Sequence, residues 1–127
     1  MTLSRWELAC ANSLCFVIKH STTKGEQAST DKLVGFGRLV TDYCTFSYLT
    51  DVYIDKVFRG KGLSVWFMEK IMETPVVQQM RVVGLKTISA GSLYTRFGFN
   101  LANNFFSFSP PGDFGQGKMD LSKLDSA

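Results

Sequence analysis

Several features that would point directly to a function are scarce in this sequence. It has one histidine, His20, and three cysteines without a C-x-x-C pair, so neither a zinc cluster nor a disulfide framework is indicated. The formal net charge of +3 is too small to indicate nucleic acid or an acidic membrane as a partner. No apolar run approaches the ~18 residues of a membrane helix, and residues 1–10 do not resemble a signal peptide. We therefore predict a cytoplasmic protein with no metal site and with reduced, mostly buried cysteines.

The length and composition indicate one globular domain. With 127 residues, of which 45% are apolar and 20% charged, the chain is long enough for one core and too short for two. We expect a single domain over residues 1–127, in which residues 112–127 form a loosely held tail.

Hydrophobic periodicity predicts an α/β fold of the α+β kind, with helices packed on a mixed sheet. The polar segment 19–32 is predicted to be a long hairpin loop, and Pro75 is expected to end the longest helix. The expected elements, in chain order, are the end of a helix at 6–11, strands at 14–18, 33–41 and 45–54, a helix at 63–73, a strand at 82–87, a helix at 90–97 and a strand at 104–108.

The segment 59–64, RGKGLS, joins a predicted strand to the start of the predicted helix. The first turn of a helix leaves four N–H groups without partners and carries about half a positive charge. Gly60 and Gly62 allow positive φ and let a phosphate approach the amides, while Arg59 and Lys61 add positive charge. A short glycine motif taken alone also fits a basic surface turn. The segment is therefore a candidate phosphate-binding loop.

A second segment, A-x-x-L-Y-x-x-F-G-F at 90–99, follows after an intervening strand. A loop of the R-x-x-G-x-[GA] type that opens a helix, then a strand, then this helix together resemble the GNAT superfamily of acyl-CoA-dependent N-acyltransferases. The resemblance covers roughly residues 8–99 and implies the family's mixed, splayed sheet. It extends, toward one subgroup of small acetyltransferases, to NSLCF at 12–16, VGFGR at 34–38, TDY at 41–43 and LTDV at 49–52.

The resemblance implies that acetyl-CoA is the co-substrate. Its pyrophosphate would lie on the amides of the 59–64 loop, and its pantetheine arm would lie along the preceding strand. Ser64 stands where the family mostly has glycine or alanine, and its small side chain still admits a phosphate. The binding residues carried over by the resemblance are Val52, Tyr53, Ile54, Arg59, Gly60, Lys61, Gly62, Leu63 and Ser64.

Two residues receive catalytic roles from the same resemblance. Tyr94 matches the tyrosine that protonates or hydrogen-bonds the departing thiolate, although a tyrosine at this helical spacing also fits a core position. Asp51 stands where many relatives place the general base, although a strand aspartate also fits a role in holding backbone N–H groups. A base has work to do because deprotonating an amine of pKa about 10.4 costs about 4–5 kcal/mol at neutral pH.

The expected reaction is transfer of an acetyl group from acetyl-CoA to a primary amine, either a small amine or a protein amine. The subgroup commonly reads T-x-D-A-H-G-L-Y before the tyrosine, whereas residues 87–94 read TISAGSLY and lack the acid and the imidazole. Two alternatives therefore stay open. One is a non-catalytic CoA-binding or interaction protein, and the other is an enzyme that performs a different small-molecule reaction on this fold.

The predicted elements begin near the end of the region that covers the acceptor site in the family. The strand and helices with which that fold usually starts have no counterpart here, so strand 14–18 is expected to form an open sheet edge. We expect either a homodimer, through this edge or the aromatic tail, or occupation of the edge by the C-terminal segment.

Overall fold

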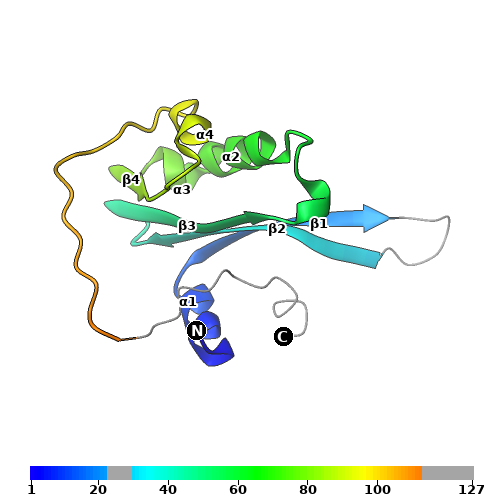
Figure 1. Cartoon of the computed structure of the whole chain (residues 1–127), viewed down its shortest axis with the longest axis horizontal. Helices are drawn as coiled ribbons and strands as arrows, with labels where there is room; N and C mark the ends of the chain where they lie inside the picture. Colours follow the sequence, from blue (N-terminus) through cyan, green and yellow to red (C-terminus); the bar gives the residue numbers. More distant parts are fainter. Residues whose placement is uncertain (23–29, 113–127) are drawn as a thin grey trace.

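A computed structural model describes residues 1–22 and 30–112 of the chain. Its four strands form one sheet in the order β1-β2-β3-β4, in which the first three run antiparallel and β4 runs parallel to β3 (Figure 1). The strands are β1 (Leu14–Thr22), β2 (Thr30–Thr41), β3 (Phe46–Ile54) and β4 (Val82–Leu85). The predicted mixed sheet is therefore confirmed. Among the described strands β1 has one neighbour, β2, as the expected open edge requires.

Helices cover both faces of this sheet. The helix α1 (Leu3–Ala11) lies on one face, while α2 (Leu63–Glu73), α3 (Pro75–Gln78) and α4 (Gly91–Thr95) lie on the other (Figure 1). The bounds of α2 are those that the sequence predicted. Thr74 is extended between α2 and α3, and the ring of Pro75 suits the first position of a helix because that position needs no N–H partner.

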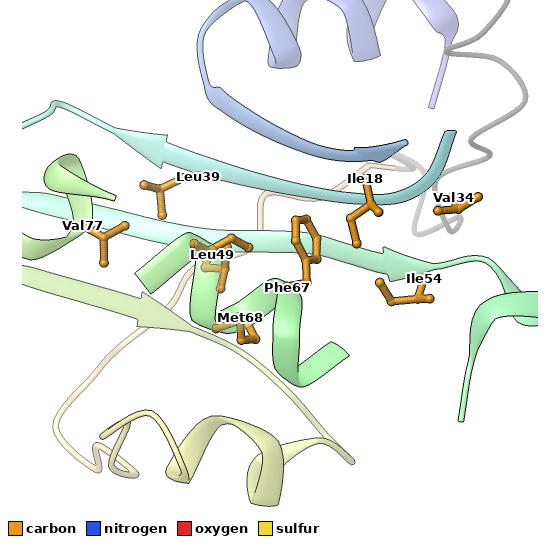
Figure 2. Packing of buried hydrophobic residues seen from close by; sticks show 9 residues of the cluster. Ile18, Val34, Leu39, Leu49, Ile54, Phe67, Met68 and Val77 are labelled. Carbon is orange, nitrogen blue, oxygen red and sulfur yellow. The ribbon is translucent and has the colours of Figure 1, made fainter. Parts of the chain in front are cut away.

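The core lies between α2 and the sheet. Phe67, Met68 and Ile71 of α2 are almost completely buried and pack against apolar side chains of the strands (Figure 2). Gly37 of β2 allows this approach, because a Cβ there would already lie 3.4 Å from the ring of Phe67. A smaller cluster on the opposite face surrounds Phe36 and includes Trp6 of α1. The members of the main buried cluster are Ile18, Val34, Leu39, Leu49, Ile54, Phe67, Met68, Ile71 and Val77.

The prediction of a loop over 19–32 is wrong at both ends. Lys19 pairs with Leu33 and Ser21 pairs with Asp31, so the β1–β2 hairpin continues through polar sequence. Backbone hydrogen bonds extend an antiparallel ladder without help from apolar side chains, and periodicity therefore misses such ends. Residues 23–29 lie outside the described part of the chain.

Three further expectations need correction or stay untested. No strand forms at 104–108, where Phe106 is 96% exposed, because aromatic residues favour strands only when a neighbouring strand packs against them. The cysteines are not mostly buried: Cys10 and Cys15 are only partly buried, and Cys44 is exposed because it lies in the turn between β2 and β3. Of the expected tail at 112–127, residues 113–127 lie outside the described part.

Candidate functional site

The strands β3 and β4 separate in the middle of β3. Their parallel pairing runs from Phe46–Val82 to Leu49–Leu85 and stops there, whereas β3 stays paired with β2 as far as Ile54. Backbone groups of residues 50–54 that point toward β4 therefore have no strand partner in the described part of the chain. We call this unpaired edge of residues 50–54 the splay. It is the type of edge to which an extended ligand with amide groups adds by hydrogen bonding.

A β-bulge lies at the start of the splay. Phe36 pairs with Tyr53 and Arg38 pairs with Thr50, so Asp51 and Val52 together face the single residue Gly37. Asp51 has φ 55°, a left-handed conformation that costs a residue other than glycine about 1–2 kcal/mol. Aspartate tolerates this conformation better than most residues because its carboxylate bonds locally. The bulge therefore changes the direction of the backbone groups of Asp51 and Val52, just after the pairing with β4 ends.

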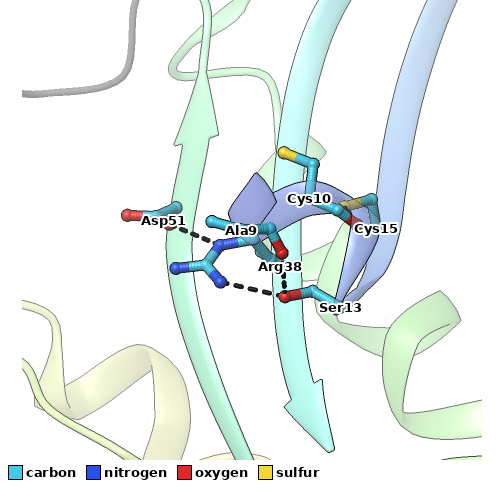
Figure 3. Close-up of polar contacts among 6 residues, drawn as sticks. All are labelled: Ala9, Cys10, Ser13, Cys15, Arg38 and Asp51. Atoms are coloured by element: carbon cyan, nitrogen blue, oxygen red, sulfur yellow. Dashed lines mark hydrogen bonds and ion pairs between the residues drawn. The ribbon is translucent and has the colours of Figure 1, made fainter. Parts of the chain in front are cut away.

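Arg38 holds the carboxylate of Asp51. Its Nε donates a hydrogen bond to Oδ2 of Asp51 at 2.9 Å, and its Nη1 donates to Oγ of Ser13 at 2.9 Å (Figure 3). The Ser13 hydroxyl donates in turn to the carbonyl of Ala9 at 2.6 Å. The side chains of Arg38 and Asp51 are only 15% and 22% exposed, so this ion pair is shielded from solvent more than a surface pair.

The partner of Asp51 differs from the one that the sequence suggested. The alternative to a general base was a carboxylate that binds backbone N–H groups, and the structure shows a guanidinium instead. Sequence reasoning missed both Arg38 and Ser13. The available signal was a cation and an anion on two predicted strands joined by a short turn, which a hairpin can place opposite each other.

The 59–64 loop presents the amino end of α2 to solvent. Gly60 and Gly62 both have φ 77°, and a Cβ built on either would find nothing within 4 Å. Gly62 is the N-cap of α2, no side chain caps the helix there, and the first intrahelical bond runs from Trp66 N to Gly62 O at 3.1 Å. The first turn of α2 thus has no side-chain cap at its N-cap, and its role as an anion-binding site stays a prediction.

Two cations flank these amides. Arg59 Nε donates to the carbonyl of Ile54 at 2.8 Å, and its guanidinium lies 5.1 Å from the centre of the Tyr53 ring. Lys61 Nζ lies 5.6 Å from the centre of the Phe58 ring. The contacts of Arg59 tie the loop to the end of β3, which brings the predicted residues 52–54 and 59–64 into one continuous surface.

Tyr94 lies on α4, on the same face of the sheet as α2 (Figure 1). Its ring meets Phe99 edge to face at 6.0 Å, and burial raises the pKa of its hydroxyl. No hydrogen bond joins Tyr94 to Asp51 or to the loop among the described residues. A half-buried phenol with a raised pKa stays protonated at neutral pH, which suits a hydrogen-bond donor better than a proton source.

The matches with known proteins identify the family. Residues 11–101 match the acetyltransferase (GNAT) domain. The chain belongs to the GNAT family. It is 30% identical over 113 residues to histone acetyltransferase TAP1 of Glycine max, a match that covers 87% of this chain and 46% of that protein. The chain thus spans about half the length of the curated relatives it matches.

Solved GNAT structures share the fold. A GNAT-family acetyltransferase from Xanthomonas campestris superposes with TM-score 0.72 at 32% identity, covering 88% of this chain and 75% of its own. An acetyltransferase from Clostridium acetobutylicum, whose crystal structure contains acetyl-CoA, superposes with TM-score 0.55 at 13% identity, covering 84% and 70%. The expectations of an α+β GNAT fold and of membership in this family are therefore confirmed.

Two features are absent from the described residues. No helix in that part of the GNAT domain is long and apolar enough to cross a membrane. The described histidine, cysteine, aspartate and glutamate side chains also form no group of three or more that could hold a metal ion.

Proposed function

We propose that this GNAT domain transfers an acetyl group from acetyl-CoA to a primary amine. The observation that carries the proposal is the junction between the splay and the amino end of α2. The Arg59–Ile54 hydrogen bond joins the end of this strand edge, which has no strand partner among the described residues, to the loop that opens α2. A ligand with an extended amide arm and a pyrophosphate fits both parts at once.

Open space and positive charge at the 59–64 loop support acetyl-CoA as the co-substrate. The open space beside Gly60 and Gly62 admits a phosphate to the amides of the first turn of α2, where Arg59 and Lys61 add positive charge. The edge at Val52, Tyr53 and Ile54 would take the amides of the pantetheine arm. Acetyl-CoA supplies an electrophilic thioester carbonyl and a thiolate leaving group.

Acyl transfer forms a bond from the amine nitrogen to the carbonyl carbon and breaks the carbon–sulfur bond. We assign to the neutral hydroxyl of Tyr94 a hydrogen bond that stabilises charge on the departing sulfur. The amine proton leaves toward water, or toward Oδ1 of Asp51, since Oδ2 already accepts from Arg38. Much of the rate would come from holding the two reactants together.

A non-catalytic CoA-binding domain is the second candidate, favoured by the sequence TISAGSLY at 87–94. The hydroxyl of Thr87 accepts a hydrogen bond from the N–H of Ala90 at 3.0 Å in the turn before α4, and this stretch contains neither a carboxylate nor an imidazole. Such a domain would bind acetyl-CoA without turning it over.

Release of free CoA from acetyl-CoA, measured against a panel of amines, separates these functions. The panel contains small primary amines and lysine peptides. We expect CoA release that depends on the amine together with acetyl-CoA binding by calorimetry. Binding without release by any amine would support the non-catalytic candidate. Absence of binding would contradict both and leave a different reaction on this fold.

A further inference from the structure

The guanidinium of Arg38 connects the bulge of β3 to Ser13 and, through it, to the end of α1. Its Nε donates a hydrogen bond to Oδ2 of Asp51, and its Nη1 donates to the hydroxyl of Ser13, which donates in turn to the carbonyl of Ala9 at the end of α1. The bonds to Asp51 and Ser13 leave in different directions from one planar group (Figure 3). Lysine could not make them equally well, because an ammonium on a flexible stem lacks the fixed fork of a guanidinium.

The conformation of Asp51 needs such support. Its φ of 55° is unfavourable for a side chain, and the bulge leaves it without a one-to-one partner on β2. A charge-assisted hydrogen bond from a largely buried guanidinium stabilises the residue in that conformation. Removal of Arg38 would leave a carboxylate that is 22% exposed, in a left-handed backbone, free to turn toward water.

The bulge lies where the direction of backbone groups matters most for the proposed function. Pairing with β4 ends at Leu49, and the splay begins with the next residues, Thr50 and Asp51. A change in the backbone at Asp51 therefore changes which way the amides of the splay point. Nothing in the 59–64 loop contacts Arg38 through a hydrogen bond or an ion pair among the described residues.

We propose that Arg38 is a positioning residue for acyl transfer, which fixes the bulge at Asp51 and so aims the backbone amides of the splay at the reacting carbonyl. This inference rests on the proposed function. It predicts that loss of Arg38 impairs the reaction while binding at the 59–64 loop persists, because the pyrophosphate amides belong to α2.

The test compares Arg38→Met with Lys32→Met. Lys32 lies on the same strand and also faces a carboxylate, Asp55 at 3.9 Å, but its side chain is 62% exposed and lies away from the bulge. In Arg38→Met we expect kcat to fall about 10- to 100-fold, with little change in the acetyl-CoA dissociation constant. Lys32→Met should retain both values. Arg38→Lys should recover part of kcat.

A structural readout keeps the test independent of turnover. Amide hydrogen exchange of residues 50–53 should accelerate by about ten-fold or more in Arg38→Met, as expected when one charge-assisted hydrogen bond is lost, and should be unchanged in Lys32→Met. If Arg38→Met unfolds, the same comparison is made with Arg38→Lys. Exchange at 50–53 equal to that of the wild type would overturn the inference.

A double variant tests whether Arg38 acts through Asp51. The kcat of Arg38→Met/Asp51→Asn should be no lower than that of the worse single variant, because both changes break one interaction. If the loss of kcat in the double variant equals the product of the two single losses, Arg38 does not act through Asp51. If the wild-type protein turns over no amine, the proposed function fails, while hydrogen exchange still decides whether Arg38 holds the bulge.

Discussion

Leu49 of β3 pairs with Leu85 of β4, and this pair is the last between the two strands. Beyond it, β2 is the one described strand that pairs with β3, so among the described residues the other edge of β3 is without a strand partner as far as Ile54, which Arg59 links to the start of α2. Under the proposed function, this surface would take the amide-bearing arm of acetyl-CoA and the anion at its end. The predictions below test this surface, the residues around it and the sheet that supports it.

Tyr94 tests the catalytic half of the account. Tyr94→Phe keeps the ring against Phe99 and removes only the hydroxyl. We expect kcat to fall on the order of 10- to 100-fold, because the lost interaction belongs to the transition state, with acetyl-CoA affinity preserved. Tyr43→Phe, at an exposed turn, is the matched control and should leave kcat unchanged. Equal kcat in Tyr94→Phe and wild type would return this residue to a packing role.

Asp42 tests the turn between β2 and β3. Its carboxylate accepts hydrogen bonds from the Thr45 hydroxyl and from the backbone N–H groups of Cys44, Thr45 and Phe46. These bonds, that from the Thr45 hydroxyl first, hold the pKa of Asp42 well below its usual range. The unfolded chain therefore takes up this proton at a higher pH than the folded one, and the stabilisation is lost as pH falls below about 4.

The corresponding measurement is the free energy of unfolding of wild type and Asp42→Asn as a function of pH. The wild type should be the more stable near neutral pH, and the difference should shrink as the solution is acidified from about pH 4. In Thr45→Val the pKa of Asp42 should move back toward its ordinary value. A difference that is the same at both ends of this pH range would show that the turn does not depend on the charge.

Gly35 tests the fit between β1 and β2. A Cβ at this position would lie 2.6 Å from Cδ1 and 2.9 Å from Cγ1 of Ile18, whereas one at Gly84 would lie 3.7 Å from the ring of Phe46. Gly35→Ala should therefore lower the free energy of unfolding by about 1–3 kcal/mol. Gly84→Ala should be neutral or stabilising by about 0.4–1 kcal/mol. Urea unfolding measures both.

A second change checks the cause of the effect at Gly35. Ile18→Val removes Cδ1, so the double variant with Gly35→Ala should recover part of the lost stability. Additive losses in the double variant would contradict a clash between these two side chains.

The sequence predicted elements well where apolar periodicity and boundary residues agreed. The helix α2 has the expected bounds because its apolar positions recur at helical spacing between Gly62 and Pro75. Polar strand ends at 19–22 and 30–32 could not be found, since their side chains carry no period that separates a buried face from an exposed one. The phenylalanines at 105, 106 and 108 predicted a strand, but this segment pairs with no strand in the described part of the chain.

The site was predictable only where one local segment carries it. The 59–64 loop could be recognised because its glycines, its cations and the helix that follows are consecutive. The hydrogen bond from Arg38 to Asp51 depends on strand register and on a bulge, which no local pattern specifies. A general-base role for Asp51 therefore had to be inferred without knowledge of the cation that holds it.

The most direct test of the central claim is a calorimetric titration of acetyl-CoA into wild type and Gly62→Asp. Gly98→Asp is the control, because Gly98 also has a positive φ, 90°, with nothing within 4 Å of its Cβ position, so it reproduces the backbone strain elsewhere. We predict that wild type and Gly98→Asp bind acetyl-CoA and that Gly62→Asp does not, since its carboxylate would stand where the pyrophosphate must lie. Equal affinity of Gly62→Asp and wild type would contradict the account.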